Sequence, residues 1–428
     1  MSYMTNPAKL AHESNAASYN NAFPVVVDRA KGSLIYAEDG TEYIDFFSGA
    51  GANNYGHNPD VLKTALLDYI TRDGINNSLD IATVVKREFV DTYYLHILQP
   101  RGLDYKLMFT GPTGTNAVEA ALKRARKVKG RSEIIAFKRG FHGVSLGSLA
   151  TTSNEYFRQA AGVPLEHVTF FPYDRIEASV EGSIAELEAA FADIDPANRP
   201  AGAIVEVIQG EGGVNAARPE WIQRLRELTT EHDMLLIVDD IQAGCGRSGN
   251  FFSFEPSGIA PDVITQSKSI SGYGSPMSLV LIKPEYDAWK PAEHNGTFLG
   301  NNHPFPPATA AINTYWRDDS LMRELADKAG LLKEALDGLV AEFPEAIIEH
   351  RGRGFLQGIV FADPAVAADV SKRAFEKHLI IERAGVDDEV VKFMPALTID
   401  EATLREGISR VVDAVREAIR GARGESTA

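Results

Sequence analysis

Between residues 105 and 285 the sequence alternates short apolar runs with segments of helical character. Seven such runs occur, at 106–110, 133–137, 167–171, 202–207, 234–239, 262–266 and 277–282. The segments between them, such as 116–128 and 220–232, repeat apolar residues at the spacing of a surface helix. Strands that are apolar throughout are typical of a parallel sheet that helices cover on both faces. We therefore predict an α/β fold with a mostly parallel seven-stranded sheet between helices.

The two ends of the chain follow another pattern. Residues 33–46 have β-prone runs on both sides of Asp39-Gly40, a dipeptide that favours a hairpin turn. Three prolines in 303–311 precede a helix-rich region that contains a predicted strand at 389–394. We predict an N-terminal segment (1–55) that packs with a small α+β domain, a large domain (56–305) and the C-terminal small domain itself (306–428).

The composition limits the kinds of partner. The 428 residues include 43 Lys and Arg against 59 Asp and Glu, a net charge of -16. Such a balance disfavours nucleic acid, whose phosphates need basic contacts. The single cysteine, Cys245, and the lack of a long apolar stretch or an apolar leader predict a cytoplasmic protein. HExxH and CxxC motifs are absent from the sequence, so no metal site is expected.

Chemically useful side chains follow several of the apolar runs. Asp239 ends one run, Lys268 follows another, Phe141 comes shortly after a third, and the Gly- and Thr-rich turn 111–115 opens a helix. Strand ends of this kind meet at one edge of an open α/β sheet. Together they supply what a pyridoxal-phosphate site needs. The lysine attaches the cofactor and moves the proton, and the carboxylate keeps the ring nitrogen protonated. The aromatic ring stacks, and the helix N-terminus binds the phosphate.

Each of these residues also has a simpler interpretation. Lys268 could be an ordinary ion-paired lysine, and Asp239 could stabilise a turn. Residues 111–116 could form only a tight turn, with Asn116 as the N-cap and Glu119 completing a capping box. Phe141 could belong to the core. The residues alone therefore leave a pyridoxal-phosphate enzyme as one of several possibilities.

A serine hydrolase is the alternative from another class. Residues 143–147 match G-x-S-x-G around Ser145, and His303 or His350 could complete a triad. That motif should follow a strand directly, whereas residues 140–142 intervene here, and no HGG-type oxyanion sequence precedes it. Short patterns of this kind often arise by chance, so the hydrolase is a remote alternative.

Longer motifs carry a family resemblance. Residues 235–249, the lysine of 267–274 that follows Asp239 by 29 positions, and the segments 141–143, 207–213 and 295–302 occur in a fixed order. This order resembles the class III pyridoxal-phosphate aminotransferases, the ornithine and 4-aminobutyrate group. The resemblance extends from residues 30–46 to 394–404 and implies the fold-type I architecture, pyridoxal 5'-phosphate as cofactor and a homodimer with shared active sites.

The resemblance also implies roles for individual residues. Lys268 would carry the cofactor and Asp239 would face its ring nitrogen. The remaining cofactor-binding positions would be Gly114 and Thr115 at the phosphate, Phe141 and Ile241 on the two ring faces, His142 beside them, Gln242 at the ring hydroxyl, and Thr297 at the phosphate of the neighbouring subunit. Glu211 would pair with a cation of the C-terminal domain and release it when glutamate binds.

Within this family the chain resembles the branch that makes 2,4-diaminobutyrate for ectoine biosynthesis, through segments such as 49–58, 111–128 and 293–302. The implied reaction moves an amino group from glutamate to aspartate 4-semialdehyde. Two substrate-binding positions depart from the expected residues. Lys392 replaces an arginine, and Asn20-Asn21 stand where Ser-Arg is usual. An ω-aminotransferase for another short aldehyde therefore remains an alternative. An aminomutase or racemase is a further alternative, because the same fold can carry out different reactions.

Overall fold

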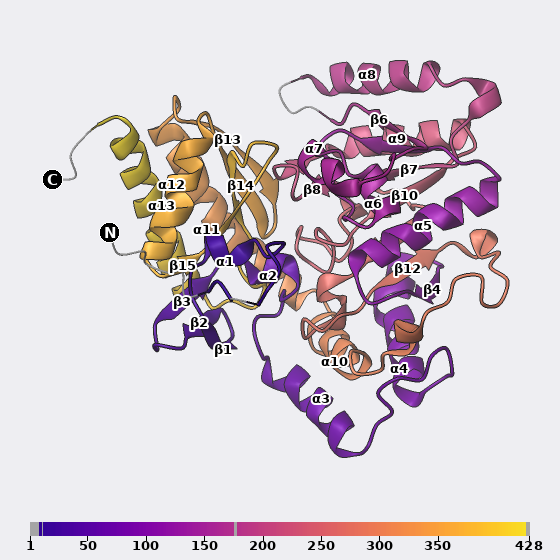
Figure 1. The fold of residues 1–428 in the computed structure, drawn as a ribbon, viewed down its shortest axis with the longest axis horizontal. Helices are drawn as coiled ribbons and strands as arrows, with labels where there is room; N and C mark the ends of the chain where they lie inside the picture. The colour runs from indigo at the N-terminus through magenta and orange to yellow at the C-terminus, as the bar shows by residue number, and fades with distance from the viewer. Residues whose placement is uncertain (1–7, 11, 175–177, 425–428) are drawn as a thin grey trace.

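The structure is a computed structural model that describes residues 8–10, 12–174 and 178–424. Figure 1 shows two lobes. The middle of the chain forms the larger lobe, and the N-terminal and C-terminal segments lie together in the smaller one. Within the described residues, no helix has the length and apolar character needed to cross a membrane.

The larger lobe is built on a seven-stranded sheet with the order β4-β12-β11-β10-β7-β5-β6. Only β12 runs antiparallel to its neighbours, so the other strands end at one edge. Each predicted run forms one strand, which confirms the predicted sheet. The strands are β4 (Lys106–Phe109), β5 (Ile134–Phe137), β6 (Val168–Phe171), β7 (Gly202–Val205), β10 (Leu235–Asp239), β11 (Val263–Gln266) and β12 (Leu279–Ile282).

Helices cover both faces of this sheet because its central strands are buried throughout. One helix, α5 (Gly114–Lys129), packs against several strands, while α9 (Pro219–Glu231) packs against β10 and a neighbouring helix. The other helices of this lobe are α3 (Asp60–Thr71), α4 (Val84–Tyr93), α6 (Leu146–Thr151), α7 (Glu155–Arg158), α8 (Val180–Ala192) and α10 (Phe305–Tyr315). A short two-stranded sheet, β8 (Ile208–Gln209) with β9 (Asn215–Ala216), lies beside them.

The smaller lobe contains two four-stranded sheets. The first joins β1 (Val27–Lys31), β2 (Leu34–Ala37) and β3 (Glu42–Asp45) to β15 (Leu379–Ile380). The antiparallel β2–β3 pair confirms the predicted hairpin, and the parallel β3–β15 pair ties the two chain ends together. The second sheet contains β13 (Ile347–Arg353), β14 (Leu356–Phe361), β16 (Glu382–Ala384) and β17 (Val390–Phe393), the last at the strand predicted for 389–394.

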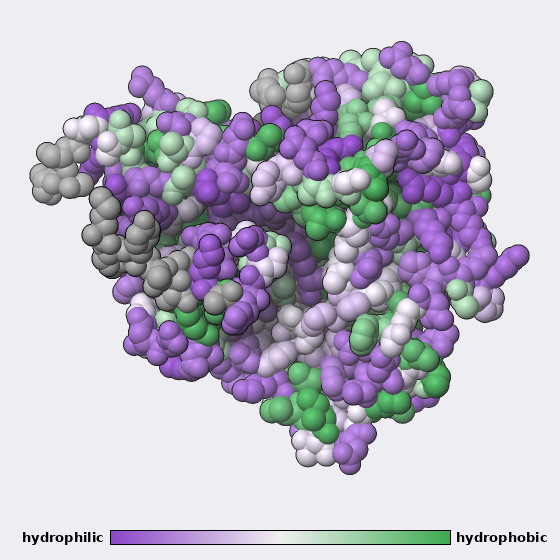
Figure 2. Space-filling model, viewed as in Figure 1, coloured by the Kyte–Doolittle hydropathy of each residue, from purple (hydrophilic) through white to green (hydrophobic). Residues whose placement is uncertain are grey.

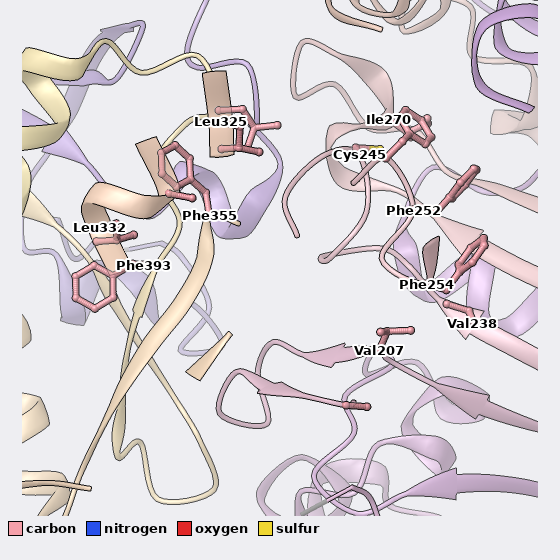
Figure 3. Packing of buried hydrophobic residues seen from close by; sticks show 14 of the residues in the cluster. Val207, Val238, Cys245, Phe252, Phe254, Ile270, Leu325, Leu332, Phe355 and Phe393 are labelled. Carbon is pink, nitrogen blue, oxygen red and sulfur yellow. The ribbon is translucent and has the colours of Figure 1, made fainter. Parts of the chain in front are cut away.

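Long amphipathic helices complete the smaller lobe: α11 (Ser320–Glu342), α12 (Pro364–Glu376) and α13 (Glu401–Ala422). Two short helical turns, α1 (Tyr19–Ala22) and α2 (Ser48–Gly51), lie toward the larger lobe. The division at residues 55 and 305 stays a prediction. Both lobes share one hydrophobic cluster, which Figure 3 shows with Leu325, Leu332, Phe355 and Phe393 on one side and Val207, Val238, Phe252 and Ile270 on the other.

A buried arginine joins segments from three parts of the chain. Arg247, in the loop after β10, donates to Asn54 Oδ1 from Nε at 3.1 Å and to the carbonyl oxygen of Phe355 at 3.1 Å. It also donates to the carbonyl oxygen of Pro395. Burial lowers the pKa of Arg247 to about 9. The guanidinium therefore holds the N-terminal segment, the large lobe and the small lobe at a single point.

Candidate active site

The carboxyl ends of the parallel strands surround a cavity of about 200 Å³. Figure 2 shows a hollow between the two lobes. The residues that line it are Gly114, Thr115, Phe141, His142, Gly143, Glu206, Glu211, Asp239, Ile241, Gln242 and Lys268. The structure thus brings together most of the predicted site residues, which come from five different strand ends.

Ser267 follows strand β11, and Lys268 then begins a 3-10 turn, Lys268–Ser271. Its φ of 51° lies in the left-handed region, a conformation that surrounding contacts must hold in place. Burial lowers the pKa of Lys268 below its ordinary value, although the Glu211 carboxylate opposes this shift. A lysine with a lowered pKa is more readily the neutral amine that attacks a carbonyl group.

Asp239 ends β10 in a network of hydrogen bonds. Its Oδ2 lies 2.7 Å from His142 Nδ1, and its Oδ1 accepts from Thr265 Oγ1 at 3.2 Å and from the backbone N–H of Ile241 at 3.2 Å. Burial alone would lower the pKa of His142, but the hydrogen bond and charge of Asp239 outweigh it and raise that pKa. The contact with Asp239 also fixes the orientation of the His142 ring. The sequence placed both residues in the site but did not predict their contact.

The N-terminus of α5 faces the other end of the cavity. Its N-cap is Thr113, whose side chain makes no capping bond and instead donates to Asn116 Oδ1 at 2.7 Å. The interpretation of Asn116 as the N-cap is therefore wrong. A Cβ added to Gly114 would come within 3.0 Å of Ile241 Cδ1, so glycine leaves the space there open. The first backbone N–H groups of α5 can thus bind an anion.

Glu119 caps a different helix from the one that the capping-box pattern implied. It accepts hydrogen bonds from the backbone N–H groups of Gly147 at 2.9 Å and Ser148 at 3.0 Å, at the start of α6. Ser145 Oγ donates to the same carboxylate at 2.7 Å and lies 2.6 Å from Thr115 Oγ1. The side chain thus holds the 145–148 turn against α5.

The hydrolase triad is not formed. Among the described residues Ser145 has no histidine beside it. His350 instead contacts Asp337 and Gln357, and His303 packs edge-on against the ring of Tyr69. The alternative that used Ser145 as a nucleophile is therefore wrong.

Phe141 and Ile241 form walls of the cavity, and Gln242 has a side-chain oxygen that accepts no hydrogen bond from the described residues. Phe141 packs edge-on against Phe157 and, like Ile241, lines the cavity. Gln242 donates from Nε2 to the carbonyl oxygen of Ala50 at 3.1 Å and to Glu211 Oε1 at 3.0 Å. Its buried Oε1 has no hydrogen-bond partner among the described residues. An acceptor in that state is suited to a hydroxyl group of a bound ligand.

Glu206 also lines the cavity, although no role was predicted for it. Its carboxylate accepts from the backbone N–H of Phe141 at 2.9 Å and from that of Gly210 at 3.3 Å. Burial raises the pKa of Glu206 to about 7, and Asp239 adds to this while His142 opposes it. The signal for Glu206 in the sequence was its position directly after β7. Its hydrogen bond with the Phe141 N–H could not be predicted, because that bond depends on how the loop folds.

A buried ion-pair cluster lies on the small-lobe side. Lys392, on β17, is fully buried, and its Nζ lies 2.8 Å from Glu211 Oε1 and 3.0 Å from Glu382 Oε1. Burial would raise the pKa of Glu211, but Lys392 and then Lys268 lower it to about 2. Burial would lower the pKa of Lys392, but the two carboxylates raise it. The structure thus forms the predicted Glu211–Lys392 contact and adds Glu382, which the sequence did not indicate.

Besides Lys392, three predicted residues lie outside the cavity. Asn20 and Asn21 are in α1, where Asn20 Nδ2 donates to Glu13 Oε2 at 3.5 Å. Asn21 lines a wider groove, of about 910 Å³, that extends to Glu211 and Glu382. Thr297 begins the 3-10 turn Thr297–Gly300 and is exposed. The residue of α1 that reaches the ion-pair cluster is Tyr19, whose hydroxyl donates to Glu382 Oε2 at 3.4 Å.

A family model described as "Aminotransferase class-III" matches residues 15–415. The chain belongs to the class-III aminotransferase family. Proteins named diaminobutyrate--2-oxoglutarate transaminase are similar to this aminotransferase over most of their length. The one from Bordetella parapertussis is 52% identical and covers 95% of this chain and 94% of its own. The one from Streptomyces avermitilis is 53% identical, with coverage of 95% and 96%, and the one from Vibrio cholerae is 51% identical, with 93% and 97%.

Solved structures show the same fold. The aminotransferase matches the ornithine aminotransferase of Toxoplasma gondii with a TM-score of 0.84 and 26% identity, over 96% of this chain and 94% of the other. A transaminase described as S-selective, from an Arthrobacter species, gives a TM-score of 0.85 at 20% identity, with 96% of both chains covered. These matches and the mostly parallel sheet confirm the predicted fold-type I architecture.

The cofactor of an aminotransferase of this class is pyridoxal 5'-phosphate, and the cavity fits it. A partly buried lysine with a lowered pKa, a carboxylate at a strand end, an aromatic wall and a helix N-terminus with free N–H groups surround one space. The unused Oε1 of Gln242 is a further acceptor there. Among the described residues, no group of three or more His, Cys, Asp or Glu side chains is arranged to hold a metal ion.

Proposed function

We propose that the aminotransferase moves the amino group of L-glutamate to the aldehyde of L-aspartate 4-semialdehyde, giving L-2,4-diaminobutyrate and 2-oxoglutarate. The observation that carries transamination is that Lys268 and Asp239, at neighbouring strand ends, line one cavity. The choice of substrates is supported by the relatives, which are about half identical over nearly the whole chain and share one name.

We propose the following roles in the larger lobe. Pyridoxal 5'-phosphate, when bound, supplies an electron sink for the carbon that loses its proton. Lys268 would hold the cofactor, and its amine would move the proton between the two carbon atoms concerned. Asp239, with His142 behind it, would place negative charge at the ring nitrogen. The remaining contacts would come from Gly114 and Thr115 at the phosphate, Phe141 and Ile241 at the ring faces, and Gln242 at the ring hydroxyl.

Glu211 and Lys392 are proposed to distinguish the two substrates. Glutamate brings a carboxylate next to the carbon that reacts, and Lys392 can bind that carboxylate when Glu211 moves away. Aspartate 4-semialdehyde reacts at its aldehyde end, where no carboxylate is adjacent, so Glu211 keeps Lys392 neutralised. The glycines on both sides of Glu211 make such a movement possible without a change in a strand.

We further propose a homodimer with shared sites. Large apolar side chains are exposed on α3, on α4, on the segment between them and on the 297–300 turn: Leu67, Ile70, Ile75, Leu79, Ile81, Val84 and Phe298. These segments lie side by side, because the Ser78 N–H donates to the carbonyl oxygen of Gly300 at 3.0 Å. A second copy would cover this apolar face. Thr297 of each subunit would then lie at the phosphate site of the other subunit. Sedimentation velocity would show a dimer, and a monomer at all concentrations would contradict it.

The location and pathway follow as proposals. A product of this kind would serve ectoine biosynthesis in the cytoplasm, and the single buried Cys245 suits a reducing compartment. Deletion of the gene in its host should stop ectoine accumulation, and added 2,4-diaminobutyrate should restore it.

The enzymatic test uses glutamate with a panel of short ω-aldehydes, scored by 2-oxoglutarate release. We expect the highest kcat/KM with aspartate 4-semialdehyde. A higher value with another aldehyde would identify a related ω-aminotransferase instead. An aminomutase or racemase would convert its amino acid without releasing 2-oxoglutarate, so this single assay separates the alternatives.

A further inference from the structure

Lys392 has two carboxylate neighbours that differ in how they are held. Glu382 is on β16, directly opposite Lys392 of β17 in the antiparallel register. Its side chain is 6% exposed, while that of Glu211 is 30% exposed. Residues at directly opposite positions of two paired strands keep their side chains close whatever the adjacent loops do. Glu382 is therefore a fixed neighbour of Lys392, whereas Glu211 belongs to a glycine-flanked loop.

The two carboxylates also differ in their contacts. Glu211 Oε1 accepts full hydrogen bonds from Lys392 Nζ at 2.8 Å and from Gln242 Nε2 at 3.0 Å. Lys392 Nζ and Glu382 Oε1 form an ion pair at 3.0 Å. Tyr19, whose ring also packs on Phe47, donates to the other Glu382 oxygen. Glu382 thus acts on Lys392 through its charge and is positioned from the opposite side by α1.

We infer that Glu382 is a specificity-determining residue, a fixed second counterion that limits how strongly Lys392 attracts a substrate carboxylate. This inference rests on the proposed function, because it concerns the carboxylate of glutamate. When Glu211 moves away, Lys392 does not become an isolated cation but keeps one carboxylate at its side. The substrate carboxylate therefore shares the ammonium charge with Glu382. The site therefore binds glutamate more weakly than it would if Lys392 had no carboxylate beside it. This favours the aldehyde substrate, for which Lys392 stays neutralised.

The charge on Glu382 should make this balance depend on pH. The groups that face it are Lys392 on β17, Glu211 on its loop, Lys268 at the start of its 3-10 turn and Tyr19 on α1. Burial raises the pKa of Glu382 to about 7, with Lys392 opposing and Glu211 adding to the shift. Below that pH Glu382 is neutral and leaves Lys392 free for the substrate. Above it the carboxylate competes, so the affinity for glutamate falls as the pH rises through 7.

The test compares wild type with Glu382→Gln, and uses Glu376→Gln as a matched control. Glu376 lines the same outer groove and loses the same charge, but Lys392 has no contact with it. Calorimetric titration of the cofactor-loaded enzyme with glutarate, an unreactive dicarboxylate, measures binding apart from turnover. For Glu382→Gln we expect Kd for glutarate and KM for glutamate to fall at least about threefold at pH 8, the size of a partly screened ion pair. The KM for the aldehyde should change less, and the wild-type pH dependence should flatten.

Tyr19→Phe is the second variant, and it keeps the inference testable if Glu382→Gln does not fold. Loss of the Tyr19 hydroxyl removes a donor that stabilises the charged form of Glu382, so Kd for glutarate should shift in the same direction by a smaller factor. Equal Kd values in wild type and Glu382→Gln, or an equal shift in Glu376→Gln, would overturn the inference. A wild-type enzyme that releases no 2-oxoglutarate from glutamate would instead refute the proposed function, whatever the variants do.

Discussion

The replacement of Asp239 by asparagine removes one charge from the cavity with almost no change in shape. Asp239 is 4% exposed and accepts three hydrogen bonds, of which the closest, at 2.7 Å, is to His142. A hydrogen bond to a charged group contributes about 1.5–3 kcal/mol, and the proposed mechanism uses the same charge for both His142 and the ring nitrogen. We therefore expect a loss of roughly 4 kcal/mol of transition-state stabilisation, which corresponds to about a thousandfold lower kcat.

Two measurements separate the electrostatic effect from a structural one. The rate is followed by 2-oxoglutarate release in single-turnover experiments with glutamate. The pKa of His142 is followed by NMR, and it should fall below its ordinary value in Asp239→Asn, because Asp239 raises it against the effect of burial. Asp240→Asn is the matched control. Asp240 is equally buried and one residue away, but it accepts from the backbone N–H of Ser253 and does not line the cavity. If Asp239→Asn kept more than a tenth of the wild-type rate, or if both variants lost the same factor, the assignment of Asp239 would be wrong.

Lys268→Ala should retain the fold and bind pyridoxal 5'-phosphate without a covalent link. Borohydride treatment should then no longer fix the cofactor, and 2-oxoglutarate release should stop. Measurable turnover would contradict the role proposed for Lys268. Ser145→Ala should keep at least about a third of the wild-type kcat, since that hydroxyl holds a turn and attacks nothing. Its loss removes the hydrogen bond to the Glu119 carboxylate and the contact with Thr115, at a cost of about 1.5–3 kcal/mol in stability. Arg247→Met should lower the free energy of unfolding by roughly 3 kcal/mol, because buried acceptors in three chain segments lose their donor. Urea unfolding measures this, with the exposed Arg323→Met as control, and equal values for the two variants would contradict a joining role for Arg247.

The sheet and the main cofactor residues could be predicted because their signals are local. A buried parallel strand must be apolar along its whole length, so the seven runs were visible one by one. Lys268 and Asp239 follow such runs directly, and the chemistry of strand ends predicts that they meet. The resemblance to a family then added Glu211 and Lys392, which now lie 2.8 Å apart.

The missed features depend on pairings between distant segments. Glu382 faces Lys392 only because β16 and β17 are in one particular register, and the sequence of β16 alone is too short to predict it. Tyr19 reaches this cluster across 363 positions of sequence. Glu119 has the spacing of a capping box, but the 145–148 turn offers its carboxylate better donors than its own helix does. A local pattern predicts that a side chain can form a bond, whereas the fold decides with which group.

The arginine at the meeting point of the three segments also constrains the order in which a newly made chain can mature. Arg247 is synthesised well before Phe355 and Pro395, whose carbonyl oxygens it needs. Until those residues leave the ribosome, the guanidinium has only Asn54 and water, and the loop after β10 cannot bury it without a large desolvation cost. The wall of the cofactor pocket that this loop supports is therefore completed late, after nearly the whole chain has emerged. A nascent chain that stops short of residue 395 should hold its sheet but not its cofactor.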